Sequence, residues 1–145
     1  MPNKIMLFKD DSGYLSNFYP CSIVLDGIGF PSVEHAFQAA KTRDWNIREK
    51  ISVLRTPGEA KRFGRVIELR PDWEEAKLEV MESLVRYKFS NDWYLAERLL
   101  KTGDAELIEG NWWGDTFWGV CMGKGENNLG KILMKVRGEL KGGQQ

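Results

Sequence analysis

The order of helix-like and strand-like segments constrains the fold of this chain more than any other feature. Helical patterns fill the middle of the chain, and the strand-like runs are residues 4–8, 21–25 with Phe30, 105–109 and 117–120. Because strands and helices do not alternate regularly, a doubly wound parallel sheet is disfavoured. The sequence therefore predicts an α+β fold, a mostly helical single domain over residues 1–145 with a small β-sheet.

Several expected helices have recognisable start and stop signals. Ser32 is the predicted N-cap of a helix that runs to about Thr42, and T-P-G-E (56–59) combines an N-cap, a first-turn proline and an acid three residues later. Asn91 is the predicted N-cap of a helix that ends at Gly103. The other expected helices cover about 46–54, 71–89 and the stretch from Asn127 or Asn128 to about Leu140.

Charge and hydropathy argue against two classes of partner. Lys plus Arg and Asp plus Glu both number 21, so the chain lacks the basic excess that drives stable binding to a nucleic-acid backbone. It has no apolar run near the ~20 residues that a membrane span requires, and its N-terminus lacks the features of a signal peptide. We therefore expect a cytoplasmic protein with no membrane partner.

The cysteines and the single histidine limit the chemistry. Cys21 and Cys121 cannot form a CxxC pair, and His35 is the only histidine, so the chain offers no Cys/His cluster for zinc, and we expect no metal and no cofactor. A lone histidine also argues against Ser-His-Asp or Cys-His catalysis, although His35 can serve as a single base. Carboxylates and lysines are the expected reagents.

The helix predicted from Ser32 carries polar residues along one edge of its apolar face. At 100° per residue, Glu34, Gln38 and Lys41 lie within about 60° of one another, beside Phe37. If this edge is buried, loss of solvent raises the pKa of Glu34, and the nearby Lys41 opposes that rise. In either case Glu34 becomes a candidate base or charge stabiliser. The alternative is a solvated helix edge with a weak Gln–Lys pair.

Residues 109–130 hold three of the six tryptophans and six glycines. Glycines give up side-chain packing and cost backbone entropy, so their density indicates a close approach to another group, and a ligand is one such group. Glu109 and Asp115 would then project carboxylates toward the ligand, and Trp118 would stack on it. The alternatives are tryptophans that fill a core, a turn role for Asp115 and a capping or ion-pair role for Glu109.

The sequence G-K-G-E-N-N-L-G (123–130) is a glycine turn that enters the last helix. It matches neither a Walker loop nor the dinucleotide-binding fingerprint. Its N–H groups, the helix dipole and Lys124 can nevertheless hold a phosphate. A plain connector is the alternative.

Eight blocks, in order along almost the whole chain, resemble one known family. They are L-S-N-F-Y-P (15–20), F-P-S-V-E-H-A-F-Q-A-A-K (30–41), A-K-R-F-G-R (60–65), K-F (88–89), L-L-K-T-G-D (99–104), L-I-E (107–109), D-T-F-W-G (115–119) and G-E-N-N-L-G-K-I-L-M-K-V-R (125–137). This ordered set is similar to the NADAR superfamily, the YbiA-like N-glycosidases. Trp112-Trp113 and Cys121-Met122 depart from the usual pattern, inside the loop expected to shape the pocket.

The resemblance implies an α+β domain that cleaves N-glycosidic bonds between ribose phosphates and base-like leaving groups. Two small-molecule substrate classes are associated with the family. Ribosylamino-pyrimidine phosphate intermediates of riboflavin biosynthesis are the first expectation for a chain of this length, and ADP-ribose attached to guanine bases, including ADP-ribosylated nucleic acid, is the second. A non-catalytic module that binds ADP-ribose or a nucleotide is a third alternative, from another functional class.

The resemblance and the chemistry of N-glycoside hydrolysis together assign roles. The transition state is an oxocarbenium-like sugar, so Glu34 or Asp115 is expected to activate water or to stabilise the cation. Lys41 is expected to hold ribose or phosphate, or to form a Schiff base with the opened sugar. Trp118, with Trp112, is expected to stack on the base, and Phe18 or Tyr19 to close the pocket. The candidate substrate-binding residues are Asn17, Phe18, Gln38, Arg65, Lys88, Glu109, Trp118, Gly119 and Asn127.

Overall fold

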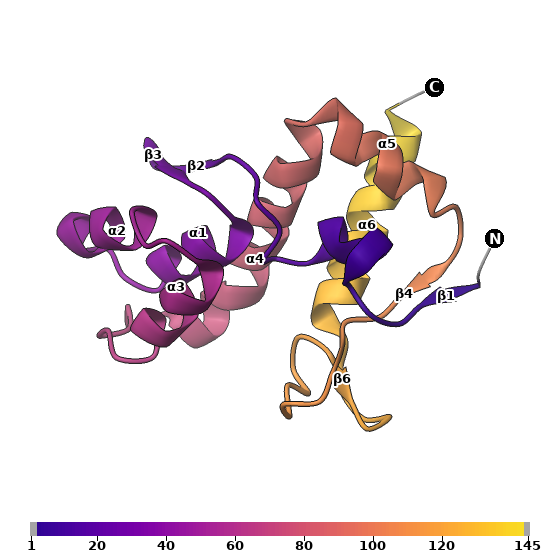
Figure 1. Ribbon diagram of the computed structural model, residues 1–145. Helices are drawn as coiled ribbons and strands as arrows, with labels where there is room; N and C mark the ends of the chain where they lie inside the picture. The colour runs from indigo at the N-terminus through magenta and orange to yellow at the C-terminus, as the bar shows by residue number, and fades with distance from the viewer. Residues whose placement is uncertain (1–2, 144–145) are drawn as a thin grey trace. The chain divides into compact units, whose positions relative to one another are not determined.

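In the computed structural model, which describes residues 3–143, the chain forms two compact units. The middle unit is residues 17–88, and the terminal unit combines the described residues up to Ser16 with those from Phe89 onward. Both units contain helices and short strands, as Figure 1 shows. The predicted α+β class is therefore confirmed.

The middle unit begins with an antiparallel hairpin of β2 (Ile23–Leu25) and β3 (Ile28–Phe30). Its two turn residues, Asp26 and Gly27, have φ angles of 50° and 82°. This left-handed conformation suits a two-residue hairpin turn, and it explains why the Asp-Gly pair marks the turn in the sequence. The strand-like run predicted at 21–25 with Phe30 therefore overlaps both strands of this hairpin.

Three short helices follow the hairpin, α1 (Val33–Ala40), α2 (Trp45–Ser52) and α3 (Pro57–Gly64). All eight residues of α1 are buried, because α2, α3 and both hairpin strands contact it (Figure 1). The predicted N-cap is confirmed, since the Ser32 hydroxyl accepts a hydrogen bond from the His35 N–H at 3.1 Å. A helix buried in this way must satisfy its polar side chains internally.

The other two helices also begin at side-chain caps. The Asp44 carboxylate accepts from the N–H groups of Asn46 and Ile47 at the start of α2. The T-P-G-E prediction for α3 is confirmed, because the Thr56 hydroxyl accepts from the Glu59 N–H at 3.1 Å. The Glu59 carboxylate in turn accepts from the Arg55 N–H at 2.9 Å, one residue before the cap.

The longest helix, α4 (Trp73–Ser90), belongs to the middle unit as far as Lys88. It confirms the helix predicted at about 71–89, and its buried apolar side chains include Trp73, Met81, Leu84 and Val85. Among the described residues, no helix combines the length and the apolar character needed to cross a bilayer.

In its described residues, the terminal unit is built from three helices and two pairs of short strands. In chain order these are β1 (Lys4–Ile5), the 3-10 helix η1 (Asp10–Leu15), α5 (Trp93–Lys101), β4 (Glu106–Leu107), β5 (Gly110–Asn111), β6 (Val120–Cys121) and α6 (Asn128–Gly142). Strand β1 pairs in parallel with β4, and β5 pairs in parallel with β6. Helix α6 contacts both α5 and β4.

The strands of the terminal unit are shorter than the sequence predicts. The runs at 4–8 and 105–109 form only β1 and β4. The run at 117–120 overlaps β6 only at Val120, and β5 is not predicted by the sequence. Each of these strands has one partner of equal length, so the ladder ends where either chain turns away. Across the described residues, the predicted small sheet is three separate two-stranded pairs.

The N-cap predicted for α5 is wrong by one residue. Asp92, not Asn91, accepts hydrogen bonds from the N–H groups of Tyr94 and Leu95, both at 3.1 Å. Asn and Asp cap helices about equally well, so propensity does not choose between neighbours. The predicted end is confirmed, since Gly103 follows α5 in the left-handed region with φ of 64°.

Backbone crowding explains four of the six glycines between residues 109 and 130. A Cβ atom would lie 2.2 Å from the Met6 carbonyl oxygen if added to Gly110, and 2.1 Å from the Glu109 oxygen if added to Gly119. At Gly125 and Gly130 it would lie 2.1 Å from the carbonyl oxygens of Gly119 and Leu107 respectively. The close approach predicted from these glycines is real, but the neighbour is the chain's own backbone and not a ligand.

Two glycines of α6 provide a direct test of this packing. We expect Gly130→Ala to destabilise the protein by about 1–3 kcal/mol, because the backbone oxygen of Leu107 cannot move aside easily. Gly138→Ala is the matched control in the same helix, since a Cβ there meets nothing within 4 Å. It should stabilise the protein by roughly 0.5–1 kcal/mol through helix propensity. Urea unfolding measures both, and equal stabilities would contradict the account.

Candidate active site

A buried carboxylate and a buried amide lie on one side of α1, as the sequence predicts. Glu34 and Gln38 are only 7% and 4% exposed, and the Gln38 amide nitrogen donates a hydrogen bond of 2.8 Å to the Glu34 carboxylate. The alternative of a solvated helix edge is therefore wrong at these two positions. Burial around α1 makes this acid and amide part of the interior of the middle unit.

The amide oxygen of Gln38 is the unusual atom in this pair. Among residues 3–143 it is buried with no hydrogen-bond partner. Leaving such an oxygen unsatisfied costs about 1–3 kcal/mol. The neighbouring residue on α3 is Gly64, where a Cβ would lie 1.8 Å from this oxygen. The structure therefore holds the Gln38 amide against Gly64 of α3.

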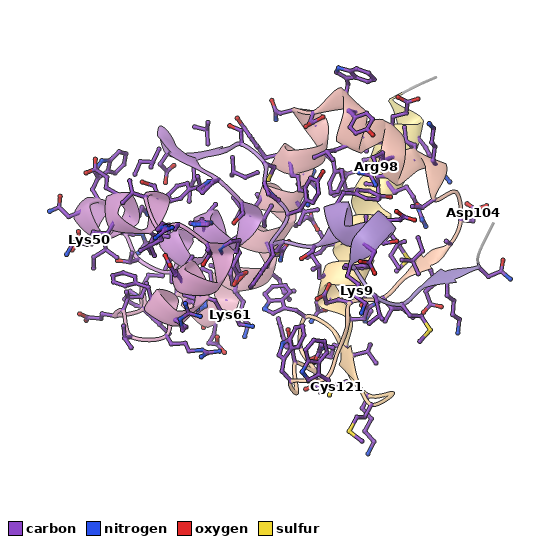
Figure 2. The ribbon with its side chains drawn as sticks, viewed as in Figure 1. Lys9, Lys50, Lys61, Arg98, Asp104 and Cys121 are labelled. Carbon is purple, nitrogen blue, oxygen red and sulfur yellow. The ribbon has the colours of Figure 1, made fainter. Side chains whose placement is uncertain are left out.

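Lys41 follows α1 directly and completes the predicted polar edge. Burial lowers its pKa, while the charge of Glu34 opposes that change and the charges of Arg65 and Lys61 reinforce it. Its ammonium nitrogen lies 5.9 Å from the centroid of the Phe37 ring. Lys61, labelled on α3 in Figure 2, was not predicted. The charges of Glu34 in the first turn of α1, of Lys61 on α3 and of Arg65 after α3 thus all act on Lys41.

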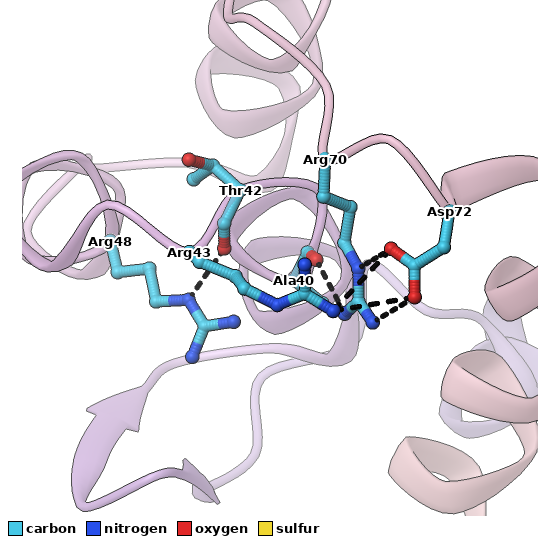
Figure 3. Close-up of polar contacts among 6 residues, drawn as sticks. All are labelled: Ala40, Thr42, Arg43, Arg48, Arg70 and Asp72. Carbon is cyan, nitrogen blue, oxygen red and sulfur yellow. Dashed lines mark hydrogen bonds and ion pairs between the residues drawn. The ribbon is translucent and has the colours of Figure 1, made fainter.

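The segment between α3 and α4 holds the last turn of α1 in place. The Arg70 N–H donates to the Lys41 carbonyl at 2.7 Å, and its guanidinium donates to the Ala40 carbonyl at 3.5 Å. Two nitrogens of the same guanidinium bind the Asp72 carboxylate at 2.6 and 2.8 Å, as Figure 3 shows. Arg70 also holds the pKa of Asp72 below its usual range. These contacts of Arg70 fix the backbone that carries Lys41.

The predicted residues Asn17 and Phe18 precede the hairpin and approach the start of α1. The Asn17 carbonyl accepts from the Glu34 N–H at 3.0 Å, and the Asn17 amide lies 3.4 Å from the sulfur of Met81 on α4. Phe18 is 43% exposed. Asn17 therefore contacts Glu34 through its backbone, and its predicted contact with substrate remains a prediction.

Lys88 is the most perturbed cation of the middle unit. It is 3% exposed, and burial lowers its pKa to about 8 while Cys21 opposes the change. Its ammonium nitrogen lies 5.6 Å from the centroid of the Tyr19 ring. A buried amine with a pKa near neutrality is typical of functional sites. Cys21 is an unpredicted neighbour of Lys88, and substrate binding by Lys88 remains a prediction.

His35 has a structural role. It is 1% exposed, its Nδ1 lies 2.6 Å from the Ser32 hydroxyl, and its Nε2 lies 3.0 Å from the Leu54 carbonyl. Both ring nitrogens are therefore engaged, and burial lowers its pKa. These contacts favour a structural role for His35 over that of a single base. Within the described residues, no three His, Cys, Asp or Glu side chains group so that they can share a metal ion.

In the terminal unit, Asp115 organises a turn. One of its carboxylate oxygens accepts from the N–H groups of Phe117 and Trp118 at 3.2 and 2.9 Å. The Asn111 side chain bonds both the N–H and the carbonyl of Asp115, at 2.9 and 2.8 Å. The turn role is thus real, and it leaves the second carboxylate oxygen of Asp115 outside these bonds. A catalytic role remains a prediction.

Asn127, Glu109 and Gly119 lie together in the same unit. The Asn127 amide oxygen accepts from the Glu109 N–H at 2.9 Å, and its nitrogen donates to the Leu107 carbonyl at 2.9 Å. Gly119 passes against the Glu109 backbone. Asn127 therefore ties the start of α6 to the chain around β4. The predicted ligand contacts of these three residues remain predictions.

The tryptophans of this segment do not fill a core. Trp112 and Trp113 are 81% and 51% exposed. Their rings pack edge to face, with 4.9 Å between the ring centroids. Trp118 is half-buried, with its ring 4.8 Å from Phe117 in a similar arrangement. Stacking of Trp118 on a base remains a prediction.

The predicted phosphate site at the start of α6 is not supported. The N–H groups of Glu126, Asn127, Asn128 and Leu129 donate to the carbonyls of residues 116, 119, 117 and 118. These groups cannot bind an anion while they hold the 116–119 loop. The plain connector that the sequence left as an alternative is the better description of the turn.

Four residues near the candidate site are not predicted by the sequence: Gly64, Lys61, Cys21 and Arg70. The block A-K-R-F-G-R (60–65) contains Gly64 and Lys61, but only its Arg65 is among the predicted site residues. A glycine that ends a helix normally indicates a turn, so nothing in the sequence pointed to the Gln38 amide.

The turn at Asp115 can be tested by stability. We expect Asp115→Ala to destabilise the protein by about 0.5–2 kcal/mol, as for loss of a helix cap, because two N–H groups lose their acceptor. Asp115→Asn keeps an oxygen at this position and should lose clearly less. Urea unfolding of the two variants checks this, and identical losses would show that the acceptor does not matter.

The buried lysine predicts a specific dependence of stability on pH. Lys88 has a pKa of about 8 in the folded chain, against 10.5 ordinarily. Between these values the unfolded chain holds more protons, so Lys88 should make the free energy of unfolding rise with pH, and below pH 8 its burial penalty is fully present. Relative to Lys88→Met, the wild type should gain stability from pH 8 to 10.5. Lys50→Met, at an exposed position on α2, is the control, and its difference from the wild type in free energy of unfolding should not change with pH. If the difference between wild type and Lys88→Met is also constant from pH 8 to 10.5, the lowered pKa of Lys88 is contradicted.

Known proteins resemble this chain over nearly its full length. The NADAR domain family matches residues 6–141. "N-glycosidase YbiA" of Escherichia coli is 41% identical over 135 residues, which cover 91% of this chain and 84% of that protein. Its NMR structure superposes with a TM-score of 0.87, covering 99% of this chain and 89% of that one. "Riboflavin biosynthesis protein VVA0006" of Vibrio vulnificus is 43% identical over 97% of this chain, which spans only 39% of that protein. The chain belongs to the NADAR domain family.

Proposed function

We propose that this chain is an N-glycosidase, a hydrolase that acts on the ribosylamino-pyrimidine phosphates of riboflavin biosynthesis. The Escherichia coli relative, which is matched over 84% of its length, is called an N-glycosidase, and this supports the reaction. The Vibrio relative is called a riboflavin biosynthesis protein, and this supports the link to riboflavin. The relatives support a small-molecule substrate, and we propose that this molecule carries a ribose phosphate.

One observation carries the chemical argument, namely the buried Glu34 carboxylate beside the Gln38 amide. Cleavage of an N-glycosidic bond develops positive charge on the sugar ring. A fixed carboxylate in a poorly solvated place stabilises such a charge far more than water does. It can also take a proton from the attacking water. Glu34 is therefore the proposed base or cation stabiliser.

The cations of the middle unit are suited to the phosphate and sugar. Lys41, Arg65 and Lys88 supply positive charge, and burial lowers the pKa of both lysines. A lysine with a lowered pKa is more often a neutral amine, which is the form that adds to the C1 imine of an opened ribosylamine. This addition releases the base as its amine, and water then hydrolyses the lysine imine. We propose that Lys41 binds the ribose phosphate, and Schiff-base formation by the same residue is the alternative mechanism.

The roles predicted from sequence for the terminal unit stay in the proposal. Asp115 is the second candidate for water activation or cation stabilisation, and Trp118 is the candidate for stacking on the base. Glu109, Gly119 and Asn127 are proposed to shape the binding site. Asp115→Asn separates these roles from folding, because the carboxamide keeps an acceptor for the turn.

Replacement of the buried acid tests the proposed function. We expect Glu34→Gln to lower kcat for release of free base by roughly 10²–10⁴-fold, the usual contribution of a general acid or base. The melting temperature should change little, because a carboxamide oxygen can still accept the Gln38 hydrogen bond. Mass spectrometry of the released base measures the rate. Glu75→Gln, at an exposed position on α4, is the matched control and should keep wild-type activity.

The same assay tests the substrate. Purified protein is incubated separately with a ribosylamino-pyrimidine phosphate and with an ADP-ribosylated guanine nucleotide. Release of base from only the guanine nucleotide would replace the proposed substrate with the second one. Tight binding of either compound without release would instead indicate a binding module, and wild-type activity in Glu34→Gln would remove Glu34 from the mechanism.

A further inference from the structure

Gly64, the last residue of α3, lies directly against the side chain of Gln38. A Cβ atom at position 64 would lie 1.8 Å from the Gln38 amide oxygen and 2.6 Å from the amide carbon. No real Cβ atom approaches another heavy atom so closely, so an alanine there and the present Gln38 conformation exclude each other. Gln38 is 4% exposed, and its surroundings limit where the amide can go.

Backbone conformation does not explain this glycine. A glycine near a helix end often adopts a positive φ. Gly64 is not among the glycines with positive φ, and the residue that follows it, Arg65, is right-handed with φ of −76°. Alanine would also favour the helix at this position. The requirement at position 64 is therefore the space that the Gln38 amide occupies.

The orientation of the Gln38 amide follows from its other partner. An ionised carboxylate only accepts hydrogen bonds, so the amide nitrogen must face Glu34 and the oxygen must face Gly64. The oxygen is the atom without a hydrogen-bond partner among the described residues. A methyl group at position 64 pushes on this oxygen, and the flexible end of Gln38 yields before the backbone does. The same rotation removes the nitrogen from Glu34.

We propose that Gly64 is a positioning residue for Glu34, because the absence of a side chain at position 64 lets the Gln38 amide hold the Glu34 carboxylate in its reactive place. This inference rests on the proposed function, in which Glu34 acts on the sugar. It also accounts for the unsatisfied amide oxygen, since the chain tolerates that oxygen to keep the nitrogen on Glu34.

The test combines Gly64→Ala with a matched glycine in the same helix. Gly58→Ala adds the same methyl group to α3, where the nearest atoms would be 3.6 and 3.8 Å away, and it should keep wild-type kcat and KM. Gly64→Ala should lower kcat by roughly 10²-fold, the cost of a misplacement of about 1 Å. Its KM should change less than about threefold, because Glu34 acts in the transition state more than in binding. A merely structural role would not divide kcat from KM in this way.

A double-mutant cycle identifies Gln38 as the intermediate. Truncation in Gln38→Ala removes the atoms that a methyl group at position 64 would strike. Gly64→Ala should therefore have no further effect on kcat or on melting temperature when it is added to Gln38→Ala, within about twofold in rate. Multiplicative losses in the double variant, or wild-type kcat in Gly64→Ala alone, would overturn the proposal.

The melting temperatures of the same variants separate failure of the positioning proposal from failure of the proposed function. If the wild-type protein releases no base from any N-glycoside, the proposed function fails, and with it the catalytic reason for placing Glu34. The melting temperatures still report on the contact itself. Loss of stability in Gly64→Ala that disappears in the Gln38→Ala background supports the contact, and loss that persists there contradicts it.

Discussion

Complete burial of α1 is the constraint on which the rest of the middle unit depends. A helix of only eight residues gains little from its own hydrogen bonds, and most of its stability comes from packing. Contacts from α2, α3 and the hairpin supply that packing, but they also enclose three polar side chains, Glu34, His35 and Gln38. Each of these has to find a partner inside the protein.

The buried polar side chains on the two sides of α1 find their hydrogen-bond partners in different ways. His35 is fully engaged by Ser32 and Leu54, so its side of the helix is structural. Gln38 satisfies Glu34 with its nitrogen and leaves its oxygen without a partner among the described residues. Natural proteins keep such incomplete solutions mainly at functional sites. Glu34, with Lys41 at the end of the helix, is therefore the centre of the proposed chemistry.

Local signals made part of this structure predictable. The Ser32 and Thr56 caps, the turn at Asp26-Gly27 and the buried face of α4 each follow from a few neighbouring residues. The spacing of Glu34, Gln38 and Lys41 on one helix edge likewise needs only helical geometry. Contacts distant in sequence were not predictable. Gly64 against Gln38, the carbonyls of 116–119 on the start of α6, and Lys88 beside Tyr19 and Cys21 depend on tertiary packing that no local pattern encodes.

The roles proposed for Glu34 and Lys41 require that this chain hydrolyses an N-glycosidic bond. The most direct measurement is mass spectrometry of the products after wild-type protein reacts with a ribosylamino-pyrimidine phosphate in water enriched in ¹⁸O. The account predicts an unmodified free base and a ribose phosphate that already contains one ¹⁸O atom when it is trapped at once by reduction. A recovered substrate with its sugar and base still joined, or ¹⁸O found only in the base, would contradict it.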